Sequence, residues 1–314
     1  MTLAAPAPAT RESRLIWATS RWSAILAARP DLEPAVSLQK QLIGRVVDLT
    51  DTIEHARLPR LSLPARYIAA KLGRGVPAFA GEPIPLPVQL MKPALIDLCE
   101  QLAAGGAGEA ADHIRTALAE ERLDAGSLLT ASFARDQKAI RTGALHRGLS
   151  PDLVWLIAEL AVSPYAHILQ GILLTPASED VTLAKARAAW RHGYCPACGS
   201  WPALAEIHAA HRVQRCSFCA HAWEMTAFGC VYCGDAGEKF ITAAAARDRD
   251  DRRLEVCGAC GGYLKTVDVD ELSPFPLLAV FDLETMELDM AAMDKGYRRP
   301  PLKDFTRKQP SDVA

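Results

Sequence analysis

The sequence predicts an α+β fold, in which a helical N-terminal domain precedes a cysteine-rich module of short strands and a C-terminal helix. Two observations predict it. Apolar residues recur at helical spacing as far as residue 192. After that point cysteine and glycine punctuate the chain, and eight of the nine cysteines fall between residues 195 and 260. The predicted parts are a flexible Ala/Pro arm at 1–10, an all-helical domain at 11–192, a cysteine-rich module at 193–270, and a strand/helix tail at 271–314.

Prolines and glycines divide the helical domain into segments. Four prolines make 76–87 an extended linker, and a Gly-rich break is expected at 105–108. Pro164 is expected to kink or split the apolar stretch in which it lies. The helical segments are 11–30, 33–58, 63–75, 88–104, 109–122, 127–145, 151–174 and 178–193.

Composition argues against two classes of partner. The formal net charge is -2 and the pI is about 6.5, so there is no electrostatic case for nucleic acid or an anionic membrane. The N-terminus lacks a charged segment followed by an apolar one. No stretch of about 18 uncharged apolar residues exists, and the best candidate, around Glu159, is short. A cytoplasmic chain without membrane insertion is expected, and in that compartment paired cysteines are metal ligands more often than disulfides.

The eight clustered cysteines form four Cys-x-x-Cys knuckles, separated by 17, 10 and 23 residues. Two such knuckles can complete a tetrahedral four-sulfur site for zinc or iron. Four matched pairs therefore predict two metal sites, and 193–270 becomes two four-cysteine metal ribbons. The predicted ligands are Cys195, Cys198, Cys216, Cys219, Cys230, Cys233, Cys257 and Cys260.

Sequential pairing of the knuckles is favoured, because each half then forms a ribbon with a hairpin between its two knuckles. Crossed pairing remains an alternative, and the spacing does not choose between zinc and iron. Four protein thiolates leave no coordination position for water, so we expect structural, sensing or electron-transfer ions and no catalytic residues. Glycine follows the second cysteine of three knuckles, where positive φ is often needed, whereas the second knuckle has Ala220.

The residues in and around the knuckles resemble those of a known family, the bacterial formate dehydrogenase accessory proteins called FdhE. The shared features are "YCPACGSWP", a second knuckle with Trp223 four residues on, "GCVYCGD", and "VCGACGGYLKTV". The closing "FDLETMELDMAAMDKGYRR" is also similar. The resemblance covers roughly residues 190 to 300.

This resemblance implies a cytoplasmic non-enzyme that assists maturation of formate dehydrogenase and contacts its catalytic subunit. It implies rubredoxin-like sites held by the eight cysteines, with two ions of iron or zinc. A zinc-ribbon nucleic-acid-binding protein is an alternative, although residues 195–264 carry seven Arg/Lys against eight Asp/Glu. A rubredoxin-like electron-transfer or thiol redox protein is another. The oligomeric state stays open, a homodimer included.

Other residues favour structural roles. His208, His211 and His221 lie beside the knuckles, but eight cysteines already fill two sites. Cys99 lies on an apolar helix and is expected to be a buried small hydrophobe. Trp201 and Trp223 are expected to cover the metal region. The carboxylates Asp282, Glu284, Glu287 and Asp289 are expected to be solvated helix charges.

Overall fold

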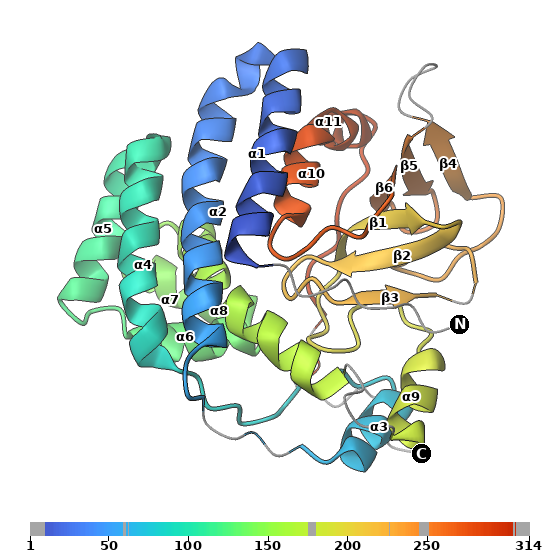
Figure 1. Cartoon of the computed structure of the whole chain (residues 1–314), viewed down its shortest axis with the longest axis horizontal. Helices are drawn as coiled ribbons and strands as arrows, with labels where there is room; N and C mark the ends of the chain where they lie inside the picture. Colours follow the sequence, from blue (N-terminus) through green and yellow to red (C-terminus); the bar gives the residue numbers. More distant parts are fainter. Residues whose placement is uncertain are drawn as a thin grey trace. The chain divides into compact units, whose positions relative to one another are not determined.

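The computed structural model describes residues 10–58, 61, 63–174, 180–225, 227–244, 251–303 and 305 (Figure 1). The flexible arm expected at 1–10 lies outside these residues, apart from Thr10. Contacts divide the chain into two units that do not follow its order. We call Ala9–Ser62 with Gly81–Leu169 the helical unit, and Leu63–Ala80 with Gln170–Ala314 the ribbon unit. The domain boundaries predicted from the sequence stay a proposal.

Side-chain caps and glycines set the limits of several helices in the helical unit. Thr10, Asp124 and Asp136 each accept a hydrogen bond from the backbone N–H three residues on. The break expected at 105–108 is present, because Gly106 has φ of +110° inside an irregular turn at Ala103–Ala107. The helices are α1 (Arg11–Ala28), α2 (Glu33–Glu54), α4 (Val88–Leu102), α5 (Gly108–Ala119), α6 (Ala125–Phe133), α7 (Gln137–His146) and most of α8 (Pro151–Leu174).

Helix α8 is continuous through Pro164, so the expected split does not occur. Its length and composition alone would allow it to cross a membrane. Half of its most apolar window is buried within the protein, and the core helix of a soluble protein has the same character. Tyr165 is fully buried and its hydroxyl donates to the Pro85 carbonyl at 2.8 Å, which ties α8 to the proline-rich stretch.

The ribbon unit contains one mixed sheet of six strands in the order β3-β2-β1-β6-β5-β4. All pairs are antiparallel except β1 and β6, which are parallel. Short helices α3 (Ala65–Gly73) and α9 (Val181–Ala188) pack on each other in this unit. The strands are β1 (Pro202–His208), β2 (His211–Cys216), β3 (Ala222–Glu224), β4 (Phe240–Ala244), β5 (Arg252–Cys257) and β6 (Tyr263–Asp268).

Strands β1–β3 and β4–β6 are two copies of one ribbon. In each copy a hairpin joins two knuckles, and the strand before the second knuckle ends at its first cysteine. Cys216 lies opposite Pro202 in one ribbon, as Cys257 lies opposite Phe240 in the other. The third strands also share one register. Arg215 lies opposite Ala222, and Val256 lies opposite Tyr263; Ala222 and Tyr263 are each the third residue after their knuckle. The predicted α+β fold with tandem ribbons is therefore confirmed.

The C-terminal part differs from its prediction in two respects. A turn around the cis Phe275–Pro276 bond occupies the place of the expected strand-like start. The helix expected to end at Gly296 is two helices, α10 (Leu278–Glu284) and α11 (Met286–Asp294). They separate at Thr285, whose φ of -113° and ψ of 24° leave the helical region. Leu288 and Ala292 of α11 pack on Leu254 and Tyr263 of the second ribbon.

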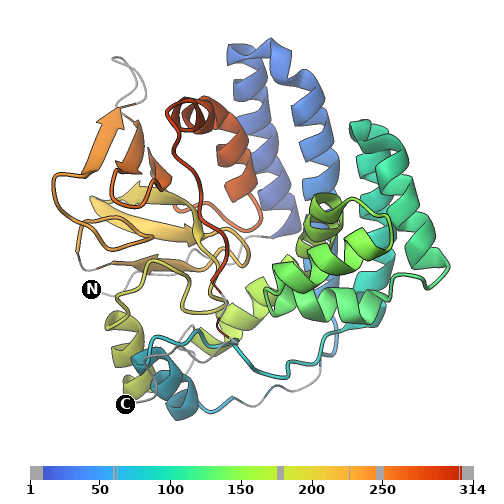
Figure 2. The ribbon, with the colours of Figure 1, turned by 180° about the vertical axis from the view of Figure 1, so that it is seen from behind.

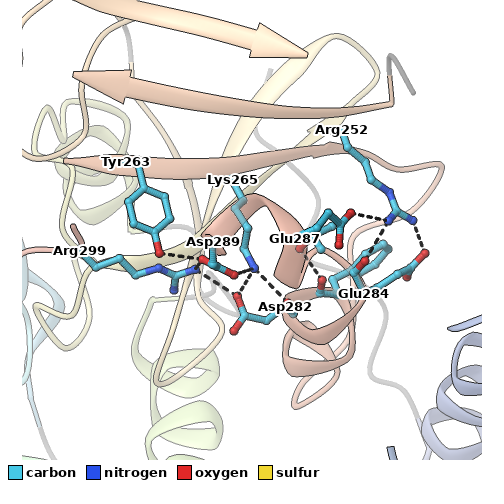
Figure 3. Close-up of polar contacts among 10 residues, drawn as sticks. Arg252, Tyr263, Lys265, Asp282, Glu284, Glu287, Asp289 and Arg299 are labelled. Atoms are coloured by element: carbon cyan, nitrogen blue, oxygen red, sulfur yellow. Dashed lines mark hydrogen bonds and ion pairs between the residues drawn. The ribbon is translucent and has the colours of Figure 1, made fainter. Parts of the chain in front are cut away.

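A buried lysine joins these helices to the sheet (Figure 3). The Lys265 side chain is fully buried, and its Nζ lies 2.6 Å from Asp282 and 2.5 Å from Asp289. Arg299 contacts the same two carboxylates at 3.1 and 3.0 Å. Burial alone would raise the pKa of Asp282, but Lys265 and Arg299 lower it below its usual value. Because the pKa is lowered, this stabilisation is present at neutral pH and is lost as the pH falls through the lowered value.

Arg252, Glu284 and Glu287 form a second group of polar contacts beside that of Lys265. Arg252 of β5 bonds both the carboxylate and the carbonyl of Glu284, and lies 3.8 Å from Glu287. The side chains of Glu284 and Asp289 are 13% and 19% exposed. The expectation of solvated helix charges is therefore wrong for these two residues. Their charges face cations that project from the second ribbon.

Replacing Lys265 tests this network. We expect Lys265→Met to lower the free energy of unfolding by about 3 kcal/mol, because it removes the buried cation that two carboxylates share and leaves them with Arg299 alone. Arg253→Met is the matched control: Arg253 and Asp268 form a pair with side chains 31% and 40% exposed, and its loss should cost less than about 1 kcal/mol. Urea unfolding of the metal-loaded chain measures both, and equal losses would contradict the account.

Candidate metal centres

The first four cysteines converge on one point inside the ribbon unit. Their sulfur atoms all lie within 4.8 Å of one another, and all four residues are buried. Cys198 Sγ is 3.4 Å from Cys216 Sγ and 3.8 Å from Cys219 Sγ, and Cys195 Sγ is 3.7 Å from Cys219 Sγ. The first knuckle precedes β1 and the second joins β2 to β3, so the hairpin β1–β2 brings them together.

The other four cysteines form an equivalent cluster on the second ribbon. Their sulfur atoms also lie within 4.8 Å of one another. The distance is 3.6 Å both between the Sγ atoms of Cys230 and Cys260 and between those of Cys233 and Cys257. These are the two groups that sequential pairing of the knuckles gives. Each could hold a metal ion.

The geometry fits a four-sulfur metal site and does not fit disulfides. Sulfur atoms at about 2.3 Å from a tetrahedral zinc ion lie about 3.8 Å apart, which is close to the 3.4–3.8 Å found here. A disulfide would require about 2.05 Å, and all nine cysteines are free. Backbone N–H groups of Ala197 and Phe218 lie 3.4 Å from Cys195 Sγ and Cys216 Sγ, as hydrogen bonds that would stabilise thiolate charge.

Each knuckle ends in a residue with positive φ. The angles are +82° at Gly199, +79° at Gly234 and +70° at Gly261. Ala220 takes the same conformation at +54°, although its Cβ makes this unfavourable by about 1–2 kcal/mol. At each of these residues the N–H donates to the carbonyl of the first cysteine of its knuckle. The departure from glycine that the sequence shows at Ala220 is thus a real site of backbone strain.

A distant segment braces the first knuckle, and sequence analysis missed it. Ala78 and Phe79 donate backbone hydrogen bonds to the carbonyls of Pro196 and Ala197, at 2.8 and 2.9 Å. Lys71 is buried, and its Nζ donates to the carbonyls of Ala78 and Ala80 at 3.0 and 2.6 Å. The proline-rich stretch was expected to be only a linker. A lysine at an apolar helical position was the one signal that this segment makes a specific contact.

Aromatic rings connect the two clusters. Trp201, just after the first knuckle, and Tyr232, inside the third, have ring centroids 5.1 Å apart. A Cβ on Gly193 would lie 1.8 Å from the Val231 carbonyl oxygen, so the backbone approaches the third knuckle very closely there. Trp201 and Trp223 are 9% and 6% exposed, which agrees with the expectation that they are buried beside the knuckles.

The C-terminal segment runs along both clusters. Arg298 donates its N–H to the carbonyl of Gly261, in the fourth knuckle, at 2.8 Å. Farther on, Pro301 accepts a hydrogen bond from Trp201 Nε1 at 2.8 Å. The Phe305 ring reaches the first knuckle, since a Cβ added to Gly199 would lie 2.4 Å from it. Figure 2 shows this segment descending from α11.

The two clusters differ in exposure. The first is entirely buried, whereas Cys233 and Cys260 of the second are exposed. Burial raises the pKa of the Cys195 and Cys219 thiols well above the ordinary value. In the second cluster burial also raises the pKa of Cys230 and Cys260, whereas at Cys257 backbone N–H groups of Cys260 and Ala259 lower the pKa on balance. The exposure of Cys233 and Cys260 makes the second cluster the more accessible of the two.

The chain is similar in sequence to several known proteins. No protein-family model matches the chain. A curated protein named FdhE homolog from Aquifex aeolicus is 27% identical over 252 residues, which is 76% of this chain and 77% of that protein. Those from Haemophilus ducreyi and Edwardsiella ictaluri are 32% and 30% identical over 119 and 115 residues, and each match spans 37% of the relative's length.

A crystal structure of the FdhE protein from Pseudomonas aeruginosa aligns with a TM-score of 0.58, over 93% of this chain and 94% of that one. The resemblance to the FdhE proteins is confirmed. At 20% identity the structural likeness shows a shared fold. The FdhE resemblance first identified in the knuckles thus extends in sequence over three quarters of the chain.

The remaining candidate residues lie outside both cysteine clusters. His221 is buried and its Nδ1 lies 2.6 Å from Gln170 Oε1, while His211 lies 3.3 Å from Glu224. His208 Nδ1 is buried, yet His208 belongs to neither four-cysteine group. Cys99 is fully buried, which raises the pKa of its thiol to about 12. It is an inert apolar residue, as expected.

A matched pair of substitutions tests the backbone constraint at the fourth knuckle. A Cβ on Gly261 would meet nothing within 4 Å, so Gly261→Ala is opposed only by its positive φ. We expect it to destabilise the second cluster by about 1–2 kcal/mol. Gly258→Ala, in the same knuckle and with ordinary φ and room for a methyl group, should cost less than about 0.5 kcal/mol. Denaturant-induced metal release measures both, and equal effects would refute the constraint.

Exposure predicts the order in which the clusters lose metal. A coloured chelator should take one ion per chain quickly and the second slowly, because only the second cluster has exposed sulfur ligands. Cys260→Ser should remove the quick phase and leave the slow one. Stopped-flow absorbance separates the two phases. Loss of both ions at one rate, or a quick phase that survives Cys260→Ser, would show that exposure does not control release.

Proposed function

We propose that this chain is an accessory protein for the maturation or assembly of formate dehydrogenase. The observation that carries the proposal is the likeness to FdhE proteins, over 76% of the chain in sequence and 93% in structure. As in the resemblance first found at the knuckles, the chain binds the catalytic subunit of that enzyme in the cytoplasm. Paired cysteines that serve as metal ligands are typical of proteins in reducing compartments.

The eight clustered cysteines hold two metal ions, iron or zinc, one in each ribbon. The support is the donor set: four sulfur atoms with metal-site spacing and N–H groups directed at them. Four thiolates complete a tetrahedral shell and leave no position for a reacting water, so the ions hold the ribbons in shape. The chain acts as a binding protein and not as a catalyst.

The exposed second cluster favours one further candidate, a rubredoxin-like redox role. Electron exchange requires a partner to approach the metal ligands, and Cys233 and Cys260 are exposed. Visible absorption of anaerobically purified protein, before and after a reductant, tests this role. A coloured protein that bleaches on reduction supports it, and a colourless zinc-loaded protein excludes it.

Removing the first knuckle tests the main proposal. Metal binding to a small ribbon supplies much of its folding free energy. We therefore expect Cys195→Ser with Cys198→Ser to unfold the ribbon unit and abolish co-purification with the catalytic subunit of formate dehydrogenase. Cys99→Ala is the control, since Cys99 is buried outside both clusters, and it should keep binding. A double variant that binds as well as the parent chain would contradict the proposal.

A further inference from the structure

Among the residues that the structure describes, nothing pairs with one edge of the sheet, and the strand at that edge carries none of the usual protection. Strand β4 is the last strand of the sheet, and Figures 1 and 2 both show it at the outer edge. Its sequence, Phe-Ile-Thr-Ala-Ala, has no charge and no proline. Ile241, Thr242 and Ala243 are all exposed. Natural sheets protect such edges with charged residues, prolines, bulges or very short strands, so an unprotected edge is a template for pairing with another strand.

The backbone of Thr242 faces away from the sheet. Gly258 donates its N–H to the Lys239 carbonyl at 2.8 Å, which fixes Lys239 as a residue bonded toward β5. In an antiparallel pair, successive residues alternate between facing the partner strand and facing away. Ile241 and Ala243 therefore bond toward β5, and the N–H and C=O of Thr242 face outward. An incoming strand would pair with Thr242.

The first ribbon shows what such an edge binds. Strand β4 is the counterpart of β1. Past a bulge between Pro202 and Leu204, Leu204 lies opposite the residue before Cys216, as Ile241 lies opposite the residue before Cys257. The edge of β1 that corresponds to the open edge of β4 is paired in parallel with β6. The chain thus contains an occupied version of this edge. Its occupant is a parallel extended strand.

A second copy of the chain does not offer the corresponding strand. The counterpart of β6 in the first ribbon is β3, with Ala222 in the place of Tyr263. Strand β6 pairs with β1 through Thr266–Asp268, which are the fourth to sixth residues of that strand. Strand β3 ends at its third residue, Glu224, and so stops before the equivalent positions. A second copy therefore cannot repeat the β1–β6 pairing at β4, which favours an occupant from another protein.

The surroundings of β4 favour an apolar occupant. Phe228 is 61% exposed and Ile241 is 53% exposed. The Phe228 and Phe240 rings are 5.4 Å apart, so an exposed aromatic group borders the start of the strand. The second cluster is adjacent, because Gly258 of its knuckle bonds to Lys239. An uncharged segment with β-branched or aromatic residues would bury these side chains as its backbone pairs with the edge.

We propose that the open edge of β4 is the docking site for an extended apolar segment of a partner protein, which adds to the sheet parallel to β4. The proposal rests on the proposed function, under which the segment belongs to the catalytic subunit of formate dehydrogenase. Backbone pairing supplies affinity, and Phe228 with Ile241 supplies selectivity. The metal ion of the second cluster would hold the knuckle on which β4 is anchored.

Thr242→Pro tests the edge directly. Proline removes the outward N–H and leaves the bonds of Ile241 and Ala243 to β5, as edge strands allow. Thr242→Val is the matched control, because it keeps the N–H. Biolayer interferometry with the purified catalytic subunit should show at least a tenfold loss of affinity for Thr242→Pro, and less than a twofold change for Thr242→Val. Ile241→Lys, which protects the edge with a charge, should also weaken binding tenfold.

The outcomes separate this inference from the proposed function. If the parent chain binds and both Thr242→Pro and Ile241→Lys bind equally well, the docking site is wrong and the proposed function stands. If the parent chain does not bind the catalytic subunit, the proposed function fails and the inference fails with it. If either variant changes the sedimentation of the chain alone, the edge joins copies of this chain and the partner assignment is overturned. Metal content and thermal unfolding verify each variant, and Ile241→Lys decides if Thr242→Pro does not fold.

Discussion

Everything in the ribbon unit depends on gathering four sulfur atoms within 4.8 Å at two points of the chain. Four thiolates brought this close repel one another, and burial of the first set adds a desolvation cost. A cation at the centre offsets both, which is why small ribbons of this kind depend on metal to fold. The backbone accepts the same constraint: each knuckle turns through a residue with positive φ, and Ala220 does so without the freedom of glycine.

Repetition of the ribbon explains the rest of the sheet. The two ribbons meet through the parallel β1–β6 pair, which makes one continuous sheet. This pair joins the β1 edge of the first ribbon to the β6 edge of the second, and these two edges are not equivalent. Such a head-to-tail joint necessarily leaves one edge of each kind unpaired. The edge at β3 is protected by its length of three residues, and the edge at β4 is not. The more exposed cysteine cluster lies on the same ribbon as the unprotected edge, so this cluster and the surface that we assign to partner binding belong to one element.

Local patterns in the sequence were sufficient to predict the clusters and the helices. Cysteine spacing, the glycine after three of the four knuckles and the hairpin between knuckles act over about 30 residues or fewer, and they indicated both groups of ligands and the strain at Ala220. Contacts between distant segments were not predictable. Nothing local shows that Ala78 and Phe79 brace a knuckle more than 100 residues later, or that Lys265 pairs with Asp282 and Asp289. The sequence indicates such contacts only through a charged residue within an apolar stretch, such as Lys71 or Lys265.

Native mass spectrometry of the anaerobically purified chain tests the central claim most directly. The account predicts a folded chain that carries two ions of iron or zinc, and a chain whose compact charge-state distribution is lost when both ions are removed. A chain that stays compact without metal would contradict it. So would a mass lower by two hydrogens for each pair of cysteines, because that would show that the clustered sulfur atoms form disulfides.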